Sequence, residues 1–259
     1  MKIIRCIDDM GHISTAAQFD NDTFIKIQGN IPEKFELTKH KVKPVKILIP
    51  YQPKSIIGIG ANYRGSFKDN PLPEYPVVFF KSYNTLQNPG DPVILPRKSI
   101  QAETVKFEGE LAVIIGKEGK NIDKSKAMDH IFGYTIANDV SASDWQGERV
   151  GMQWCKGKGF DTFCPLGPAI VTSDEIPEPA DLRIVTYVNG EKAQDESVRG
   201  MCFSIPELIS FLSAGHTLEA GDLILTGTPP GAYFIDAGSI TEITIKPIGT
   251  LSNPWIIET

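Results

Sequence analysis

Short apolar runs, interrupted repeatedly by glycine and proline, constrain the fold of this chain more than any other feature. They recur after Pro50, at Ile56–Ile59, Val77–Phe80 and Leu111–Ile115. Runs of this length suit β-strands, whereas an amphipathic helix needs a longer segment with a period of about 3.6 residues. The sequence therefore predicts a β-rich protein of the α+β class.

A hairpin and a late strand support this prediction. Apolar and polar residues alternate from Leu182 to Val188, and Asn189-Gly190 follows, a pair typical of the type I′ turn between two strands. The residues of Ile240–Ile245 also alternate, which predicts another half-buried strand near the end of the chain.

Only two helices are predicted. One covers Lys124–Phe132, with Asp123 as its N-cap. The other covers Ile205–Ser213, where Ser204 precedes the helix and Glu207 stands three residues later, which is the spacing of a capping box. Neither changes the β-rich assignment.

The length of 259 residues suits one large domain with a small addition. Near the N-terminus the sequence predicts short strands at Ile3–Cys6 and Thr23–Ile27, followed by a polar, lysine-rich connection through Pro44. We therefore expect a small N-terminal subdomain over residues 1–50 and a main domain over residues 51–259.

Charge and hydropathy exclude several kinds of partner. The net charge is −6 and the 26 Lys and Arg residues are spread thinly, which argues against a nucleic-acid surface. No apolar run approaches the roughly 20 residues of a membrane-spanning helix. The segment Met1–Met10 lacks the apolar stretch of a secretory signal. We expect a cytoplasmic protein that binds a small molecule, with no nucleic-acid or membrane partner.

Two carboxylates are expected to share one face of a strand. Glu108 and Glu110 stand two residues apart at the start of an apolar run, so both side chains point the same way. If this strand enters the core, the two acids repel one another unless a cation lies between them. Taken alone, the pattern is explained better by an exposed Glu-x-Glu on a strand edge, because short acidic motifs are unspecific.

A second acidic strand end changes this balance. An apolar strand is predicted over residues 133–138, and Asp139 follows it directly. The four cysteines show no C-x-x-C spacing and the four histidines form no ligand pair, so a metal site here must be built from oxygen. Three carboxylates favour Mg²⁺ or Mn²⁺, with Ca²⁺ as a further candidate, over zinc.

Two segments rich in small residues offer groups for an anionic ligand. Lys158 stands between Gly157 and Gly159, which lets the backbone approach a ligand and leaves the ammonium free to reach an anion; a plain surface lysine is the alternative. Gly227 and Thr228 follow a predicted buried strand, where amides and a hydroxyl can cradle a carboxylate. A simple tight turn explains this second segment equally well.

Four motifs together resemble the fumarylacetoacetate hydrolase family, and in particular its small bacterial-type acylpyruvases, oxaloacetate decarboxylases and 2-hydroxyhepta-2,4-diene-1,7-dioate isomerases. The resemblance runs from about Ile56 to Ile245, and Phe107 stands where the first motif usually has tyrosine. In chain order the motifs are Phe-Glu-Gly-Glu-Leu-Ala-Val-Ile-Ile-Gly at 107–116, Gly-Tyr-Thr-Ile-Ala-Asn-Asp-Val-Ser-Ala-Ser-Asp-Trp-Gln at 133–146, Gly-Lys-Gly-Phe-Asp-Thr-Phe-Cys-Pro-Leu-Gly-Pro at 157–168 and Leu-Thr-Gly-Thr-Pro-Pro-Gly at 225–231.

The resemblance implies a mixed β-roll or sandwich-like catalytic domain, a homodimer, and a Mg²⁺ or Mn²⁺ ion that chelates the carboxylate and 2-oxo group of an acylpyruvate-type substrate. By matching position, it implies that Glu108, Glu110 and Asp139 are the metal ligands. The residues that it places beside the substrate are Lys158 and Thr162 at the scissile centre, Gln146, Gly227 and Thr228 as binding groups, and Lys81 as a lining residue.

The chain departs from the family pattern where the family activates water. On the loop at Phe67–Pro76, which reads as a lid, and just before it, the family's histidine and glutamate are replaced by Ser66 and Asp69. The arginine of the second motif is Ser143 here, and the serine after the motif lysine is Gly159. These changes bear directly on which reaction the chain catalyses.

Hydrolysis of a carbon–carbon bond needs a base to activate water, and an unperturbed serine such as Ser66 cannot serve unaided. Decarboxylation or keto–enol tautomerisation needs chiefly a stabilised enolate, which a metal and Lys158 can supply. We therefore favour a decarboxylase or tautomerase/isomerase that acts on a small 2-oxo acid. The alternatives are a C–C bond hydrolase in which Asp69 acts as the base, and a catalytically inactive relative that binds metal and oxo acid.

Overall fold

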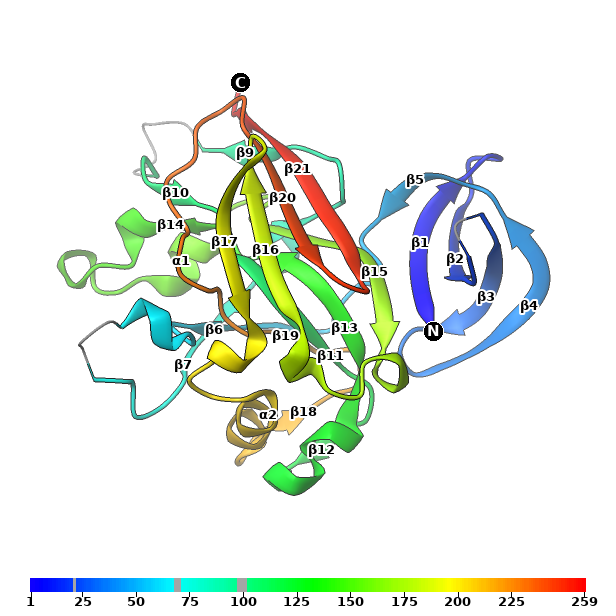
Figure 1. Cartoon of the computed structure of the whole chain (residues 1–259), viewed down its shortest axis with the longest axis horizontal. Coiled ribbons are helices and arrows are strands. Elements are labelled where there is room, and N and C mark those ends of the chain that lie inside the picture. The colour runs from blue at the N-terminus through cyan, green and yellow to red at the C-terminus, as the bar shows by residue number, and fades with distance from the viewer. Residues whose placement is uncertain (21, 68–70, 97–101) are drawn as a thin grey trace.

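The structure is a computed structural model that describes residues 1–20, 22–67, 71–96 and 102–259. Two β-sheets of 12 and five strands dominate the described part of the chain (Figure 1), which confirms the prediction of a β-rich α+β fold. The larger sheet runs in the order β4-β3-β2-β1-β15-β13-β11-β19-β6-β7, with β5 paired to β1 and β8 paired to β15. Its strands are β1 Lys2–Asp8, β2 Ile13–Gln18, β3 Phe24–Asn30, β4 Lys34–Val42, β5 Pro44–Leu48, β6 Ile56–Gly60, β7 Val77–Lys81, β8 Leu86–Gln87, β11 Gly109–Ile115, β13 Ile131–Asn138, β15 Cys164–Thr172 and β19 Leu223–Leu225.

The smaller sheet runs in the order β17-β16-β20-β21-β9. Its strands are β9 Val93–Leu95, β16 Arg183–Val188, β17 Glu191–Ser197, β20 Ile240–Ile245 and β21 Gly249–Ile257. Two short ladders complete the described strands: β10 Val105–Lys106 with β14 Ser141–Ala142, and β12 Gly119–Lys120 with β18 Thr217–Leu218. The α-helices are α1 Trp154–Lys158 and α2 Ile205–Ser213, and short 3-10 turns include η1 Arg64–Ser66, η4 Lys124–His130 and η5 Ser143–Trp145.

Strand β11 separates two apolar clusters because its side chains alternate between the two faces of the larger sheet. Leu111 belongs to one buried cluster with Ile184 and Ile243 of the smaller sheet. Ala137, which pairs with Glu110 across the ladder, belongs to the cluster on the other face. Glu110 therefore points away from the smaller sheet.

Several predicted elements are confirmed. The three apolar runs form β6, β7 and β11, and the predicted late strand is β20 with the same bounds. Asn189 and Gly190 connect β16 and β17 with φ values of 51° and 82°, the positive values that a type I′ turn requires. Helix α2 also has its predicted bounds, and the Glu207 carboxylate accepts the backbone N–H of Ser204 at 2.7 Å.

Two predictions about local structure are wrong. The polar stretch before Pro44 is not a connection, because Lys34–Val42 is strand β4 and pairs antiparallel with β3. Most of its side chains are exposed, so pairing rather than burial forms this edge strand. The predicted helix at Lys124–Phe132 is a 3-10 helix that ends at His130, and Phe132 already belongs to β13, since pairing of β13 with β11 outweighs local helix preference.

The N-terminal strands β1 to β5 are hydrogen-bonded into the larger sheet and extend it. Strand β1 pairs with β2 along one edge, and along its other edge it pairs first with β15 of the main body and then with β5. In Figure 1 these blue strands form a lobe beside the rest of the molecule. No helix in the described ranges is long and apolar enough to cross a membrane.

Candidate metal centre

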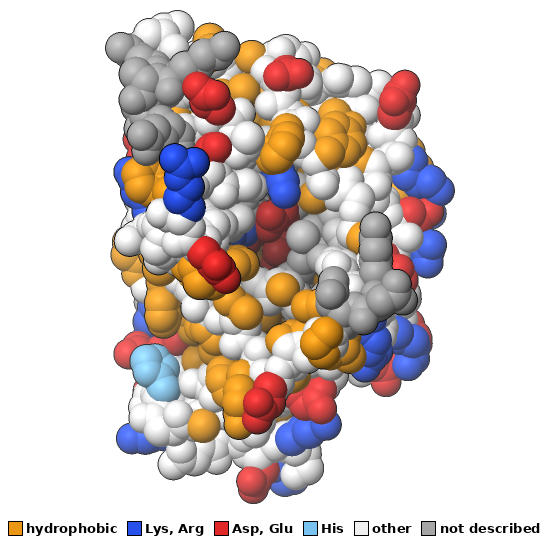
Figure 2. Space-filling view, turned by 90° about the vertical axis from the view of Figure 1, so that its left-hand side faces the viewer, with side chains coloured by type: hydrophobic (Ala, Val, Ile, Leu, Met, Phe, Trp, Pro, Cys, Tyr) orange, Lys and Arg blue, Asp and Glu red, His pale blue; other side chains and the backbone are white. Residues whose placement is uncertain are grey.

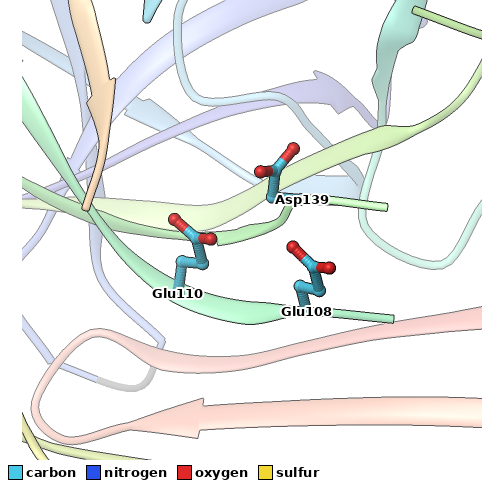
Figure 3. Close-up of side chains that lie close together, drawn as sticks. All are labelled: Glu108, Glu110 and Asp139. Carbon is cyan, nitrogen blue, oxygen red and sulfur yellow. The ribbon is translucent and has the colours of Figure 1, made fainter. Parts of the chain in front are cut away.

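Antiparallel pairing of β11 with β13 brings the three predicted acidic residues together. Gly109 pairs with Asn138, so the residue just before β11 meets the residue just after β13, and the Asp139 N–H donates to the Glu108 carbonyl at 2.8 Å. Figure 3 shows the three carboxylates projecting the same way from these two strands. One oxygen of each lies within 4.8 Å of the others. We call Glu108, Glu110 and Asp139 the carboxylate cluster.

Backbone and side-chain donors hold the two glutamates of the cluster in place. The Glu108 N–H donates to the side-chain oxygen of Asn138 at 2.9 Å, and the Ser141 hydroxyl donates to Glu108 Oε1 at 2.8 Å. The Gly227 N–H donates to Glu110 Oε2 at 2.7 Å. Each of these contacts joins segments distant in sequence, so the cluster exists only when the sheet is assembled.

Two buried lysines enter the cluster. The Lys158 ammonium lies 2.6 Å from Glu108 Oε2 and 2.6 Å from Asp139 Oδ2, and it also donates to the Asp139 carbonyl at 3.1 Å. The Lys81 ammonium lies 2.8 Å from Asp139 Oδ1 and donates to the Val140 carbonyl at 3.2 Å. With all five groups ionised, three carboxylates and two ammonium groups leave a net charge of −1.

The surroundings shift the pKa values of these groups in opposite directions. Burial raises the pKa of Glu110 well above its usual value, and the neighbouring Asp139 carboxylate raises it further. Burial acts the same way on Asp139, but the Lys158 and Lys81 ammonium groups outweigh it and hold the pKa of Asp139 below its usual value. Burial lowers the pKa of Lys158, yet the attraction of Asp139 and Glu108 raises it overall. Lys158 therefore stays protonated at neutral pH.

The donor set fits a hard divalent cation. Glu110 is 1% exposed, and no lysine or arginine among the described residues lies within ion-pair distance of it. A buried carboxylate without a countercharge is unfavourable, and a cation between the three acids removes that cost. Carboxylate oxygens alone select Mg²⁺, Mn²⁺ or Ca²⁺. Glu108, with 16% of its side chain exposed, opens the cluster to solvent.

One face of the molecule carries a depression. Figure 2 shows acidic side chains deep in a depression on one face of the molecule, with hydrophobic side chains around it. Glu108 is the most exposed member of the carboxylate cluster, so a small molecule from solvent would meet this carboxylate first.

The loop after β19 is fixed against the cluster and against the smaller sheet. Gly227 has a φ of 101°, and a Cβ there would lie 2.7 Å from the Cβ of Asn62, so only glycine fits. The Thr228 hydroxyl donates to the Gly109 carbonyl at 3.0 Å and accepts from Gln194 Nε2 at 2.8 Å. The groups predicted to cradle a substrate carboxylate thus already have partners within the protein.

Gln194 on β17 is 1% exposed and contacts the segments that carry the site, which the sequence did not reveal. Its amide oxygen accepts from the Gly109 N–H at 3.2 Å and from the Thr186 hydroxyl at 2.8 Å. Its amide nitrogen donates to Thr228 and to the Pro229 carbonyl. One side chain therefore ties β11 to the loop after β19, and no local motif could have indicated this.

Of the other predicted substrate residues, Gln146 lies near Lys158 of the cluster and Thr162 contacts β9. Gln146 follows η5, and its side chain packs beside Gly157, next to Lys158. Thr162 has a φ of 67°, and its hydroxyl accepts the Ile94 N–H at 2.8 Å, so it anchors β9.

The lid residues are only partly described. Ser66 is exposed in η1, and its backbone N–H donates to the Tyr63 carbonyl at 3.0 Å. Asp69, the predicted alternative base, lies outside the described residues.

Comparison with known proteins identifies the family. Residues 55–255 match the family described as fumarylacetoacetate (FAA) hydrolase, C-terminal. The chain is 48% identical over 218 residues to oxaloacetate tautomerase YisK of Bacillus subtilis, covering 79% of this chain and 70% of that protein. It is 44% identical over 222 residues to mitochondrial oxaloacetate tautomerase fahd2 of Xenopus laevis, covering 82% and 69%.

A solved structure agrees over the full length. The 5-carboxymethyl-2-hydroxymuconate delta-isomerase of Mycobacterium smegmatis has a TM-score of 0.88 and 35% identity, over the whole of both chains. The resemblance carried by the four motifs is thus confirmed, and the chain belongs to the fumarylacetoacetate hydrolase family.

Proposed function

We propose that this protein is a divalent-metal-dependent enzyme that interconverts the keto and enol forms of a small 2-oxo acid, oxaloacetate being the first substrate to test. The observation that carries the proposal is the carboxylate cluster with the protonated Lys158 inside it. The names of two relatives, both oxaloacetate tautomerases, support the choice of substrate.

Tautomerisation moves one proton from C3 to the 2-oxo oxygen, while the C3–H bonding pair becomes the π bond between C2 and C3. Held by Glu108, Glu110 and Asp139, a Mg²⁺ or Mn²⁺ ion would supply a Lewis acid that favours the enolate. Lys158 adds a positive charge in a site with little water, where such a charge stabilises developing negative charge strongly. Because its pKa is raised, Lys158 stays protonated and serves as a fixed positive charge and hydrogen-bond donor, not as the base that abstracts the proton.

Lys81 takes a different role in this proposal. Its side chain is fully buried and its ammonium faces Asp139 and the Val140 carbonyl. We assign it to positioning Asp139, rather than to contact with substrate as the motif match implies.

Decarboxylation of a β-oxo acid is the second candidate, because it passes through the same enolate that Lys158 stabilises. Hydrolysis of an acylpyruvate ranks below both, since Ser66 stands where the family has its water-activating histidine and a serine hydroxyl is a weak base. A homodimer in the cytoplasm stays a prediction from the resemblance and the sequence.

The decisive experiment follows oxaloacetate in the presence of Mn²⁺ with and without the protein. We expect the protein to accelerate keto–enol relaxation at least tenfold over Mn²⁺ alone, measured by enol absorbance, with CO₂ release and acylpyruvate cleavage assayed in parallel. Excess chelator should abolish the acceleration. If none of the three reactions is accelerated, the protein is a binding relative and the proposal is wrong.

Metal binding should stabilise the fold, because the cation neutralises three carboxylates that repel one another. We expect the melting temperature to rise on addition of Mg²⁺ or Mn²⁺, and Glu110→Gln to remove most of that rise. Glu103→Gln, a change of the same kind outside the cluster, is the matched control. An unchanged metal response in Glu110→Gln would remove Glu110 from the site.

A further inference from the structure

A third lysine shares the face of the carboxylate cluster. Side chains alternate along the segment before β11: Val105 and Phe107 are buried in one apolar cluster, so Lys106 and Glu108 point to the other face. The ladder agrees, because Lys106 pairs with Ser141, and paired residues lie on the same face of a sheet. The Ser141 hydroxyl touches Glu108. Lys106 therefore points to the same face as Glu108, the member of the carboxylate cluster that is partly exposed to solvent.

Unlike the two lysines inside the cluster, Lys106 has no acidic partner among the residues that the structure describes. Its ammonium lies 5.0 Å from the centroid of the Phe234 ring, and within the described ranges no carboxylate lies at ion-pair distance from it. Lys106 and Phe234 also form an antiparallel bridge, and Tyr233 packs edge-on against Phe107 at 5.0 Å. The aromatic segment thus holds the lysine side chain in place, and no acid in the described part of the chain neutralises its charge.

The spacing suits a substrate with two acidic ends. Residues two apart on a strand have Cα atoms roughly 6.6 Å apart. A four-carbon oxo diacid that is held at the cluster by one carboxylate and its 2-oxo group extends its other carboxylate over a comparable length.

The charges also balance. With all three acids ionised, as a bound cation favours, the cluster with Lys158 and Lys81 carries −1 and a divalent ion brings the total to +1. Lys106 makes +2, which a dianionic oxo acid neutralises. A monocarboxylate would leave a net charge of +1.

We propose that Lys106 is the specificity-determining residue that binds the distal carboxylate of a four-carbon dicarboxylate. This inference rests on the proposed function for the place of the 2-oxo end, and it deepens that function by naming the substrate class as dicarboxylic oxo acids.

Stable 2-hydroxy acids test binding without turnover. We expect the Mn²⁺-loaded protein to bind malate at least tenfold more tightly than 2-hydroxybutyrate, which lacks the second carboxylate, in titration calorimetry with each malate enantiomer. Lys106→Met should weaken malate binding tenfold or more and change 2-hydroxybutyrate binding less than threefold, and Lys106→Arg should retain the preference. Lys120→Met removes an exposed lysine on β12 and controls for the change in net charge.

Equal affinity of the wild type for the two acids, or an equal loss of both in Lys106→Met, would overturn the inference. Oxaloacetate and 2-oxobutyrate turnover separates this outcome from failure of the proposed function. If the wild type turns over neither oxo acid but Lys106→Met abolishes the malate preference, the proposed reaction is wrong and Lys106 still selects dicarboxylates. If oxaloacetate is turned over and Lys106→Met slows both oxo acids alike, the reaction stands and the assignment of Lys106 falls.

Discussion

Replacing Lys158 with methionine should lower kcat for oxaloacetate at least a hundredfold, which is about 2.7 kcal/mol of activation free energy. The ammonium is buried and lies 2.6 Å from two of the acids that would hold the metal, so its charge acts where little water screens it. Methionine keeps most of the length of the side chain and removes the charge. Steady-state kinetics at saturating Mn²⁺, with the melting temperature of the variant recorded alongside, would measure the effect.

Ser66→Ala is the comparison for this experiment, because Ser66 is exposed in η1 and replaces the family's histidine. If the lid only excludes water, this variant should lose less than about tenfold, under about 1.4 kcal/mol. A result in which Ser66→Ala abolishes turnover and Lys158→Met spares it would invert the assigned roles.

Replacing Asp139 with asparagine should destabilise the protein in the absence of metal by about 3 kcal/mol or more. This change removes the carboxylate that both Lys81 and Lys158 face, and breaking a buried ion pair from one side leaves an uncompensated charge. Metal-induced stabilisation should be lost as well. Urea unfolding in excess chelator, followed by titration with Mn²⁺, measures both effects.

Asp144→Asn is the matched control for Asp139→Asn. Asp144 Oδ2 accepts only the Thr104 N–H, at 2.8 Å, and faces no lysine within ion-pair distance in the described structure. Its replacement should cost less than about 1 kcal/mol, because the asparagine amide oxygen can still accept the Thr104 N–H. If both variants lost the same free energy of unfolding, the ion pairs of Lys81 and Lys158 with Asp139 would not contribute to stability.

Local patterns predicted much of the fold. Alternation, apolar runs and turn residues gave the hairpin at Asn189 and the bounds of β20 and α2, because each depends on residues close in sequence. Strand β4 was missed because its residues are mostly polar and exposed and alternate only briefly, at Phe35 and Leu37. Its pairing depends on the partner strand β3. A pairing partner is a tertiary feature that a local pattern does not contain.

The carboxylate cluster was predictable because strand alternation and a strand end have simple geometric consequences. Glu108 and Glu110 needed only a period of two, and Asp139 needed only to follow a strand. The contacts around the cluster were not predictable. Gln194 reaches Gly109 across 85 residues of sequence, and its place depends on how the two sheets pack.

Lys106 rests on the ring of Phe234, outside the ladder that carries the carboxylate cluster. The residues around Lys106 can therefore be changed without changing the cluster. The acids and their lysines are fixed by ladders in the sheet interior, where a substitution disturbs packing and charge together. The segment around Phe234 is half exposed, and the ladder between β11 and β13 does not include it. Directed evolution for new oxo acids should therefore begin at positions 106, 233 and 234, where side-chain changes leave the catalytic scaffold intact.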